Sequence, residues 1–447
     1  MILASAAVFM DYLDTSIVSI ALPAISADFG AGSSTMSWVM TSYLLALGST
    51  LLLFGKLADR VGHERMIFTL GFGLFTFMSL LCGMSTGIVM LILFRVFQGF
   101  AAAMMVSTAT MLITTRLPEK MRGVGMGIIA ALGGVALALG PGIGGILTEY
   151  VSWHWIFFIN IPVGIAGVIL SLVLIPKSES KPCVKQSFDF AGAVLLAITL
   201  VSLLAGLELG VSDGWTPTVI LLLVIFPIAG FLFFRREIRH PDPVLSTKLL
   251  LNRTVMWASL STLLMTLVYL GVIYVMPFYL TGPYRISVAA AGLIMLLPPV
   301  SMALIGIPAG ALTGKVGCMR LCNIAAVIMA SGLLILASGI FNSIMPVIFA
   351  GLLLVGLGMG LNEGPSIQRI TIHSPPELQG SSGSLIFTVM NIGCVLGVAV
   401  FSFAASYGSG SADMYTSAGI AVSCLAGFIA AILAYVTSRL ARDLIGC

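Results

Sequence analysis

The chain is built from long apolar runs, each of about 20 residues, which is the length that an α-helix needs to cross a bilayer. We predict fourteen such spans, with connections too short to hold a soluble domain. The spans cover residues 2–25, 36–57, 66–86, 88–114, 123–148, 153–175, 189–209, 217–234, 254–281, 288–313, 321–340, 344–362, 381–404 and 416–437. Because the runs are continuous, whereas the strands of a membrane barrel alternate in polarity, the sequence predicts an all-α polytopic membrane protein.

Composition and charge placement support this topology. Hydrophobic residues make up 59% of the chain and charged residues 9%, with a mean hydropathy of +1.12, whereas a soluble domain has about 25% charged residues. If both termini are cytoplasmic, 19 of the 21 Lys and Arg residues fall in inner connections, and only Arg285 and Arg95 do not. This bias follows the positive-inside rule. We therefore expect a multi-pass protein of the plasma membrane, surrounded by lipid, and no nucleic-acid partner.

Two acidic residues lie in the first apolar run. Asp11 and Asp14 are one helical turn apart, and together with Thr15 and Ser19 they fall within about 140° of a helix surface. Acids at this depth are costly and usually face a polar interior. The functional interpretation is a site for protons and cations that faces a central cavity. The alternative is a structural pair hydrogen-bonded to neighbouring helices.

An internal repeat divides the chain. The segment GKLADRVGHER, Gly55–Arg65, follows the second predicted span, and GALTGKVGCMR, Gly310–Arg320, follows the tenth; six of eleven positions agree in identity or charge. Repeats on the same side of the membrane indicate two parallel halves. We predict six-helix bundles in residues 1–175 and 254–447, with an inserted helix pair and its linkers in residues 176–253.

The first of these segments resembles the signature loop of the major facilitator superfamily, GxLaDRxGRR. Asp59, Arg60 and Gly62 match the signature, whereas His63 and Glu64 replace its usual basic pair. The resemblance implies a gating loop in which Asp59 and Arg60 form a charge-relay latch between helices. The alternative is a basic loop that only sets the topology.

Two helix segments are similar to motifs of the 14-helix drug:proton antiporters, the QacA/EmrB type. LDTSIVSIALP, Leu13–Pro23, places Asp14 at the acidic position of that family, and LILFRVFQGFAAA, Leu91–Ala103, carries Arg95 and Gln98. The resemblance implies that Asp14 is the first candidate for proton coupling, with Asp11 as a modulator or second substrate contact. It also implies that Arg95 modulates the protonation of an acidic partner. Gln98 is one helical turn from Arg95 and is expected to share its network. A structural ion pair that joins two helices is the alternative for Arg95.

Two further segments resemble the same antiporters. The run Gly140-Pro141-Gly142-Ile143-Gly144-Gly145 matches the end of the antiporter motif of the fifth helix, and WHWIFFINIPVG, Trp153–Gly164, has His154 in place of a common Arg. Gly140 and Pro141 permit a kink and a close helix approach. The resemblance implies that this bend limits leakage. Plain packing is the alternative for each glycine of the motif, including Gly140, Gly144 and Gly145.

The residues and the resemblance together predict a proton-coupled exporter that works by alternating access on lipophilic, cationic drugs or toxic compounds, and so contributes to antibiotic resistance. We expect no cofactor, no metal site and no ATP, because the proton gradient supplies the energy, and we expect a monomer to be the functional unit. Glu363, at the end of the twelfth span, is expected to be a structural acid at the inner edge. An exporter of a specific metabolite, lipid or siderophore is the first alternative, since it would use the same fold; a membrane enzyme or sensor is the remote one.

Overall fold

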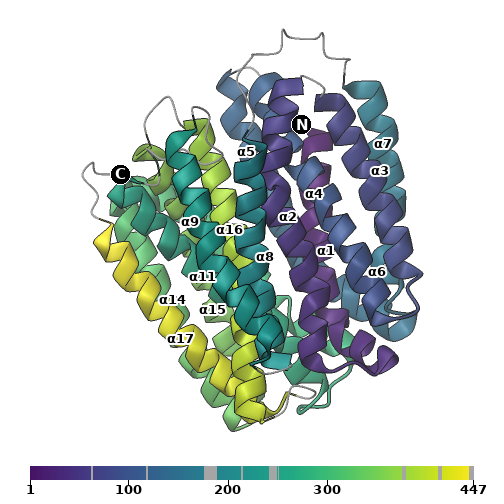
Figure 1. The fold of residues 1–447 in the computed structure, drawn as a ribbon. Helices are drawn as coiled ribbons and strands as arrows, with labels where there is room; N and C mark the ends of the chain where they lie inside the picture. Colours follow the sequence, from purple (N-terminus) through teal and green to yellow (C-terminus); the bar gives the residue numbers. More distant parts are fainter. Residues whose placement is uncertain are drawn as a thin grey trace.

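The computed structural model describes residues 1–61, 64–116, 119–175, 189–212, 215–240, 249, 251–374, 379–410 and 415–441. These residues form an elongated bundle of α-helices (Figure 1), and no strand occurs within them. The helices are α1 (Ile2–Phe29), α2 (Ser33–Val61), α3 (Glu64–Gly83), α4 (Ile88–Arg116), α5 (Glu119–Tyr150), α6 (Trp155–Phe158), α7 (Asn160–Leu174), α8 (Phe190–Ser212), α9 (Pro217–Arg239), α11 (Arg253–Thr281), α12 (Val288–Ile294), α13 (Leu297–Val316), α14 (Cys318–Phe341), α15 (Met345–Ile372), α16 (Gln379–Ser409) and α17 (Ser417–Leu440).

The all-α membrane fold is confirmed, but the predicted count of fourteen spans is not supported. Within the described residues, twelve helices are long and apolar enough to cross a membrane. The predicted spans 36–57 and 189–209 have no counterpart among the twelve. Both regions are helical, as α2 and α8, but α2 carries polar residues at both ends and the described apolar part of α8 is only Ala191–Leu203. Twelve of the fourteen predicted spans are therefore supported within the described part of the chain.

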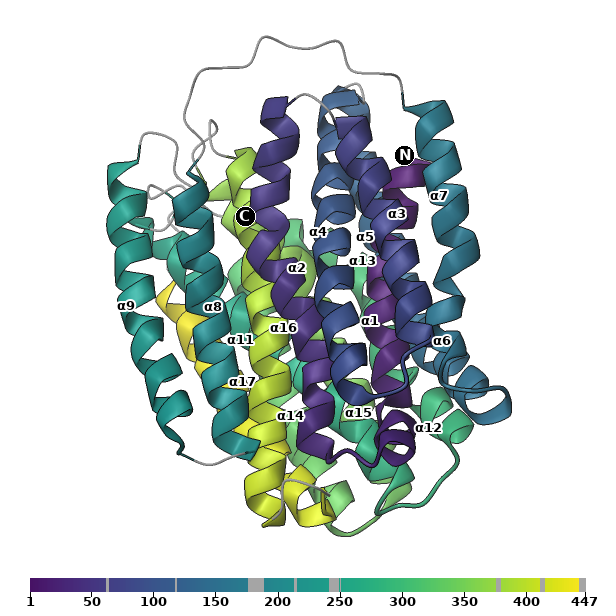
Figure 2. The same ribbon diagram turned by 45° about the vertical axis from the view of Figure 1, so that its right-hand side comes forward.

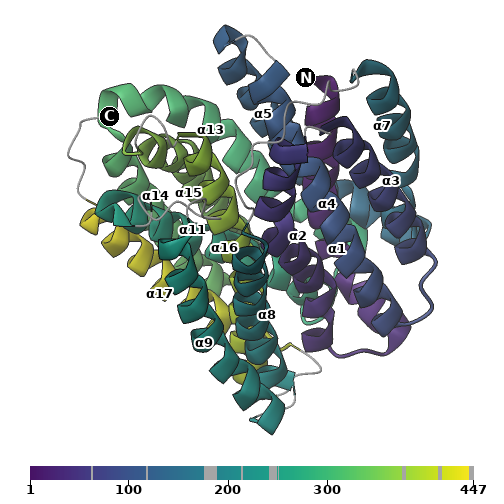
Figure 3. The same cartoon turned by 45° about the horizontal axis from the view of Figure 1, so that its top comes forward.

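The helices pack in two groups. α1 to α7 contact mainly one another, as do α11 and α13 to α17, and Figure 3 shows α1–α7 on the right with α14–α17 on the left. α8 packs along α9 and contacts α2 and α16, so this hairpin lies against both groups (Figure 2). The groups meet where α1, α2 and α5 contact α11, α12, α13 and α16. The central space between them is therefore bordered by helices from both halves of the chain.

Local sequence explains where several helices begin and end. α1 ends at Gly30, which adopts a left-handed conformation with φ of 60°. The Gly30 N–H donates a hydrogen bond to the carbonyl oxygen of Ser26. Thr216 and Asn252 cap α9 and α11 by accepting backbone N–H groups. Asp189 caps α8 through the Gly192 N–H and also accepts a hydrogen bond from Arg236 of α9 at 2.5 Å. This pair fastens one end of the α8–α9 hairpin.

Successive long helices run in opposite directions, so the molecule has two distinct ends. We call the end where α1 begins the Met1 end, and the end where it stops the Gly30 end. The two repeat segments join α2 to α3 and α13 to α14, and both connections lie at the Met1 end. α12 lies at the Gly30 end (Figure 2).

Candidate functional site

Asp14 is completely buried within the first group of helices, where it forms an ion pair with Arg95 of α4. Arg95 also donates from Nε to the carbonyl oxygen of Val39 at 3.0 Å and from Nη1 to Gln98 Oε1 at 2.8 Å. A buried charge needs a partner of opposite charge and further hydrogen bonds, because water no longer solvates it. Asp14 and Arg95 satisfy that requirement for each other.

Amide groups complete the surroundings of Asp14. Gln98 Nε2 and Asn160 Nδ2 each donate to Asp14 Oδ1 at 3.0 Å. The same two amides reach the hydroxyl of Ser79 in α3, at 2.7 Å from Gln98 and 3.4 Å from Asn160. The network thus joins α1, α3, α4 and α7, and it brings together the predicted site residues Asp14, Arg95 and Gln98.

Tyr43 of α2 links this network to Asp11. Its hydroxyl donates to Asp11 Oδ1 at 2.5 Å, and its ring lies under the Arg95 guanidinium, 4.0 Å from the centroid. A cation over an aromatic face is attracted to it. Gly99 of α4 allows this close packing, because a Cβ at that position would overlap the carbonyl oxygen of Tyr43. Tyr43 therefore contacts both Asp11 and Arg95.

The two aspartates face different surroundings, whereas the sequence predicted one shared polar stripe toward the cavity. Asp11 lines the central cavity between the two groups of helices, and Asp14 is not among its lining residues. One turn of separation along a helix leaves about 60° between two side chains. That angle is enough to direct Asp14 toward Arg95 and Asp11 toward the cavity.

The central cavity is small and mostly apolar. Its volume is about 90 Å³, and α1, α2, α4, α5, α11, α13, α15 and α16 all contribute to its wall. Its polar and aromatic lining residues include Asp11, Tyr12, Thr15, Tyr269, Glu363, Phe387 and Asn391. Pockets for drug-sized ligands measure roughly 300–1,000 Å³. A ligand of that size would require the two groups of helices to move apart.

Glu363 is not at the inner edge as expected. It lies within α15, nine residues before the helix ends at Ile372, and it lines the central cavity. The prediction assumed that the span ended near residue 362, but the helix continues to Ile372. Glu363 therefore places a carboxyl group from the C-terminal half on the same cavity as Asp11.

The glycine motif of α5 brings backbones together. A Cβ at Gly140 would overlap Ser16 Oγ of α1, and one at Gly144 would lie 2.6 Å from Ile20 Cγ2. Gly145 faces α12 instead, with the Val288 carbonyl oxygen 2.8 Å from its ideal Cβ position. Pro141 lies within α5, and its carbonyl oxygen approaches Gly292 of α12. The motif therefore packs α5 on α1 and on α12 at once.

We predict that Gly145→Ala lowers the stability of the protein, because its methyl group must push α5 and α12 apart. The cost of such overpacking is about 1–3 kcal/mol. Gly134 is a matched control in the same helix, because a Cβ there meets no atom within 4 Å. Thermal unfolding of the purified protein should show a lower midpoint for Gly145→Ala and no loss for Gly134→Ala. Equal midpoints would contradict the packing described here.

The gating-loop residues are only partly within the described structure. Asp59 and Arg60 lie near the end of α2, but their side chains fall outside the description, as does Gly62 entirely. Their role as a latch stays a prediction. Among the described residues, no group of three or more His, Cys, Asp or Glu side chains could hold a metal ion.

Sequence reasoning did not single out Tyr43, Asn160 or Ser79. Asn160 had a signal, since it is an amide within the segment Trp153–Gly164 that resembles the antiporters. Tyr43 and Ser79 had none, because single Tyr and Ser residues are ordinary in apolar helices. Only the folded arrangement shows that all three surround the two aspartates.

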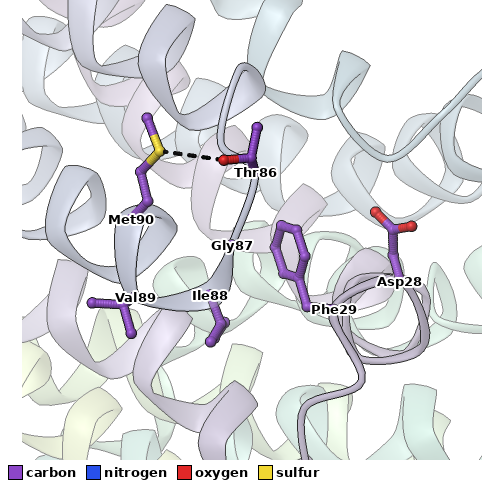
Figure 4. A pocket seen from close by; sticks show the side chains of 7 residues that line it. All are labelled: Asp28, Phe29, Thr86, Gly87, Ile88, Val89 and Met90. Carbon is purple, nitrogen blue, oxygen red and sulfur yellow. Dashed lines mark hydrogen bonds between the residues drawn. The ribbon is translucent and has the colours of Figure 1, made fainter.

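A second hollow lies at the Gly30 end (Figure 4). It measures about 580 Å³ and is lined by Asp28, Phe29, Thr86, Gly87, Ile88, Val89 and Met90. Its one acidic side chain, Asp28, accepts a hydrogen bond from Trp153 Nε1 at 3.0 Å, and Trp153 stacks on His154. Burial lowers the pKa of His154, while the negative charge of Asp28 opposes that shift. Asp28 already accepts a hydrogen bond from Trp153, whereas the central cavity is lined by Asp11 and Glu363. The central cavity is therefore the stronger candidate site.

Comparison with known proteins identifies the relatives of this chain. The sequence profile of the Major Facilitator Superfamily matches residues 4–398. Riboflavin transporter RibZ of Clostridioides difficile is 35% identical over 88% of this chain and 85% of its own length. Multidrug transporter protein MdtP of Bacillus subtilis is 34% identical, over 79% of this chain and 65% of that protein. The tetracenomycin C resistance and export protein of Streptomyces glaucescens is 31% identical, over 88% and 73% respectively.

Solved structures share the fold. A bacterial homolog of the human lysosomal transporter Spinster, in its inward-facing and occupied conformation, superposes with a TM-score of 0.68 and 14% identity, over 98% of this chain and 95% of that one. The inward open conformation of the xylose transporter XylE from E. coli gives a TM-score of 0.65 at 12% identity, over 100% and 96%. The sequence family points to a membrane transporter rather than an enzyme.

Proposed function

Since this chain belongs to the Major Facilitator Superfamily, we propose that it exports lipophilic, cationic compounds in exchange for protons. The observation that carries the proposal is the position of Asp11, which lines the central cavity and is joined through Tyr43 to the buried Arg95–Asp14 pair. A carboxylate open to the cavity can receive either a proton or a cation. The same group can thus serve both ligands in turn.

Charge balance explains the exchange. The network contains two carboxyl groups, Asp11 and Asp14, and one guanidinium, Arg95. With both acids ionised, Arg95 neutralises Asp14 and one negative charge remains on Asp11. In a low-dielectric interior that charge attracts one cation strongly. A proton on Asp11 weakens the attraction of the cavity for a cation, so the arrival of the proton favours release of a bound cationic compound.

Alternating access follows from the two groups of helices. We propose that residues 1–175 and 254–447 form the two six-helix bundles that rock about the central cavity, with residues 176–253 as an inserted pair and its linkers. The Met1 end would face the cytoplasm, so that Arg65, Arg236, Arg320, Arg369 and Arg439 are on the inner side. The cavity lies within one chain, so a monomer suffices for this cycle.

Within the superfamily, we propose the drug:proton antiporter type. The buried Asp14–Arg95 pair involves the two helix segments that resemble that type. The relatives of this chain include a multidrug transporter protein and a tetracenomycin C resistance and export protein. Gly140, Pro141, Gly144 and Gly145 would then limit leakage by holding α5 on α1 and α12. The proton gradient would supply the energy.

A carrier for a specific metabolite is the second candidate. It is favoured by the riboflavin transporter, which matches this chain at 35% identity over 85% of its own length. Riboflavin would be the first metabolite to test.

Whole-cell efflux separates the two candidates. Cells that express the protein are loaded with a cationic dye or with riboflavin, and efflux is followed with and without a protonophore. We expect dye efflux that the protonophore abolishes. Riboflavin movement without any dye efflux would favour the metabolite carrier, and dye efflux that persists with the protonophore would contradict proton coupling.

A hydrogen bond joins the two halves of the chain at the Gly30 end, and we propose that it helps to close the cavity there. Glu149, near the end of α5, accepts a hydrogen bond from the Ala289 N–H in the first turn of α12 at 2.7 Å. An acidic group at a helix N-terminus is favourable because the N–H groups there lack partners within the helix. This bond adds to the close packing of Gly145 on α12.

We predict that Glu149→Ala opens the cavity more often at the Gly30 end. Cys394 lines the cavity and can report on this, once the other cysteines are replaced by alanine. A membrane-impermeant thiol reagent added on that side should label Cys394 severalfold faster in Glu149→Ala. Glu149→Gln, which keeps an oxygen acceptor, should stay close to the parent. Identical labelling rates in all three proteins would show that the contact does not hold the cavity closed.

A further inference from the structure

The proposed proton exchange assigns no role to the carboxyl group of Glu363. Glu363 lies in α15, on the opposite half from Asp11, and both side chains line the central cavity. Among the residues that the structure describes, the Glu363 carboxylate has no hydrogen bond or ion pair. Asp14 differs, because Arg95 and two amides occupy its oxygens. Glu363 is therefore available to a ligand in the cavity.

Tyr269 of α11 supplies a second, independent observation in the same wall. Its side chain is only 5% exposed, it lines the cavity, and its hydroxyl has no hydrogen-bond partner among the described residues. A buried polar group is normally paired, and leaving one unpaired is costly. Tyr43, on the other half, is satisfied by Asp11. A ligand that hydrogen-bonds to the Tyr269 hydroxyl would remove this deficiency.

The remaining wall defines the body of the ligand. Tyr12 and Phe387 provide aromatic rings, and Met302, Met359 and Met390 provide flexible apolar side chains that adapt to different shapes. None of the residues described along the cavity wall is Lys, Arg or His. The wall therefore favours an apolar, aromatic body with a positive charge and disfavours an anion.

We propose that Glu363 and Tyr269 form a subsite in the C-terminal half that binds the protonated amine of the exported compound. A protonated amine can donate one N–H to the carboxylate and another to the hydroxyl oxygen, whereas a quaternary ammonium group has no N–H and satisfies neither as a donor. The inference rests on the proposed export of cations and narrows it to compounds with an amine or amidine group. Asp11 remains the group that exchanges the proton.

Binding of a matched pair of fluorescent probes tests the subsite. Pyrenylmethylamine and its trimethylammonium analogue share the ring system and the charge but differ in the N–H groups. With purified protein in lipid nanodiscs, we expect wild type to bind the amine at least about tenfold more tightly, in line with hydrogen bonds to a charged group. Glu363→Gln should remove most of the affinity for both probes. Tyr269→Phe should reduce only the preference for the amine.

The outcomes separate this inference from the proposed function. Equal affinity of wild type for the two probes would overturn the inference, as would unchanged binding by a folded Glu363→Gln variant. If that variant fails to fold, the wild-type probe pair and Tyr269→Phe still decide the matter. Proton-driven export of the trimethylammonium probe at the same rate as the amine would refute the subsite but support the exporter. If wild type binds neither probe and moves neither, the proposed function fails.

Discussion

Asp14→Asn is expected to abolish proton-driven export. The carboxylate is the counter-ion of Arg95 and accepts hydrogen bonds from Gln98 and Asn160, so its loss leaves a buried guanidinium without a negative partner. Breaking one side of a buried ion pair costs roughly 3–5 kcal/mol. We expect export of a cationic dye from energised cells to fall to the level of cells without the protein, and the thermal midpoint of the purified variant to fall as well.

A double variant separates the structural part of this effect from the functional part. Asp14→Asn combined with Arg95→Gln removes both charges, so no buried charge is left unpaired. We expect the double variant to regain much of the lost stability without regaining export. Recovery of export together with stability would mean that the pair only joins α1 to α4. The single variant Arg95→Gln completes the double-mutant cycle, which measures the interaction between the two side chains.

Asp11→Asn is expected to uncouple transport from the proton gradient while leaving the fold intact. The amide oxygen of Asn can still accept the Tyr43 hydrogen bond, but the side chain can no longer exchange a proton. Asp11 has no ion pair among the described residues, so its neutralisation leaves no charge unpaired. In proteoliposomes, we expect the acceleration of dye transport by an imposed pH gradient to fall at least about tenfold, which corresponds to about 1.4 kcal/mol in a barrier.

Tyr43→Phe is the matched control for Asp11→Asn. It removes the hydrogen bond to Asp11 and keeps the ring on which Arg95 rests. We expect it to retain gradient-driven transport with a shifted pH dependence, because Asp11 can still exchange protons. If the Asp11→Asn variant responds to the gradient like wild type, proton coupling must occur at another residue.

Much of the fold and part of the site could be predicted from the sequence. Apolar runs of membrane length, the charge asymmetry and the repeated segments predicted an all-α membrane fold, and the family is confirmed by the profile match over residues 4–398. Asp14, Arg95 and Gln98 were each predicted as site residues, and the structure places them in direct contact. These residues stood out because polar groups are rare in apolar runs.

The remainder depended on helix rotation and helix length, which composition does not reveal. The structure separates Asp11 from Asp14 because a rotation of about 60° directs them to different neighbours. Glu363 was misplaced because α15 continues for nine residues beyond it. Tyr43 and Ser79 are common residue types in apolar helices, so their position beside the two acids becomes visible only when α2 and α3 are packed against α4.

The number of spans differs between the sequence prediction and the described helices. Hydropathy along the chain predicted fourteen, and the described helices include twelve that are long and apolar enough. The difference lies in α2 and α8, which contact each other and α16.

Proton movement during transport tests the central claim most directly. Proteoliposomes that contain the purified protein and an internal pH dye are prepared without a pH gradient, and a lipophilic amine is then added on one side. An exchanger moves protons in the direction opposite to the cation. We therefore predict a pH change that requires the substrate and is absent in Asp11→Asn. Substrate transport by wild type with no accompanying proton movement would contradict the account.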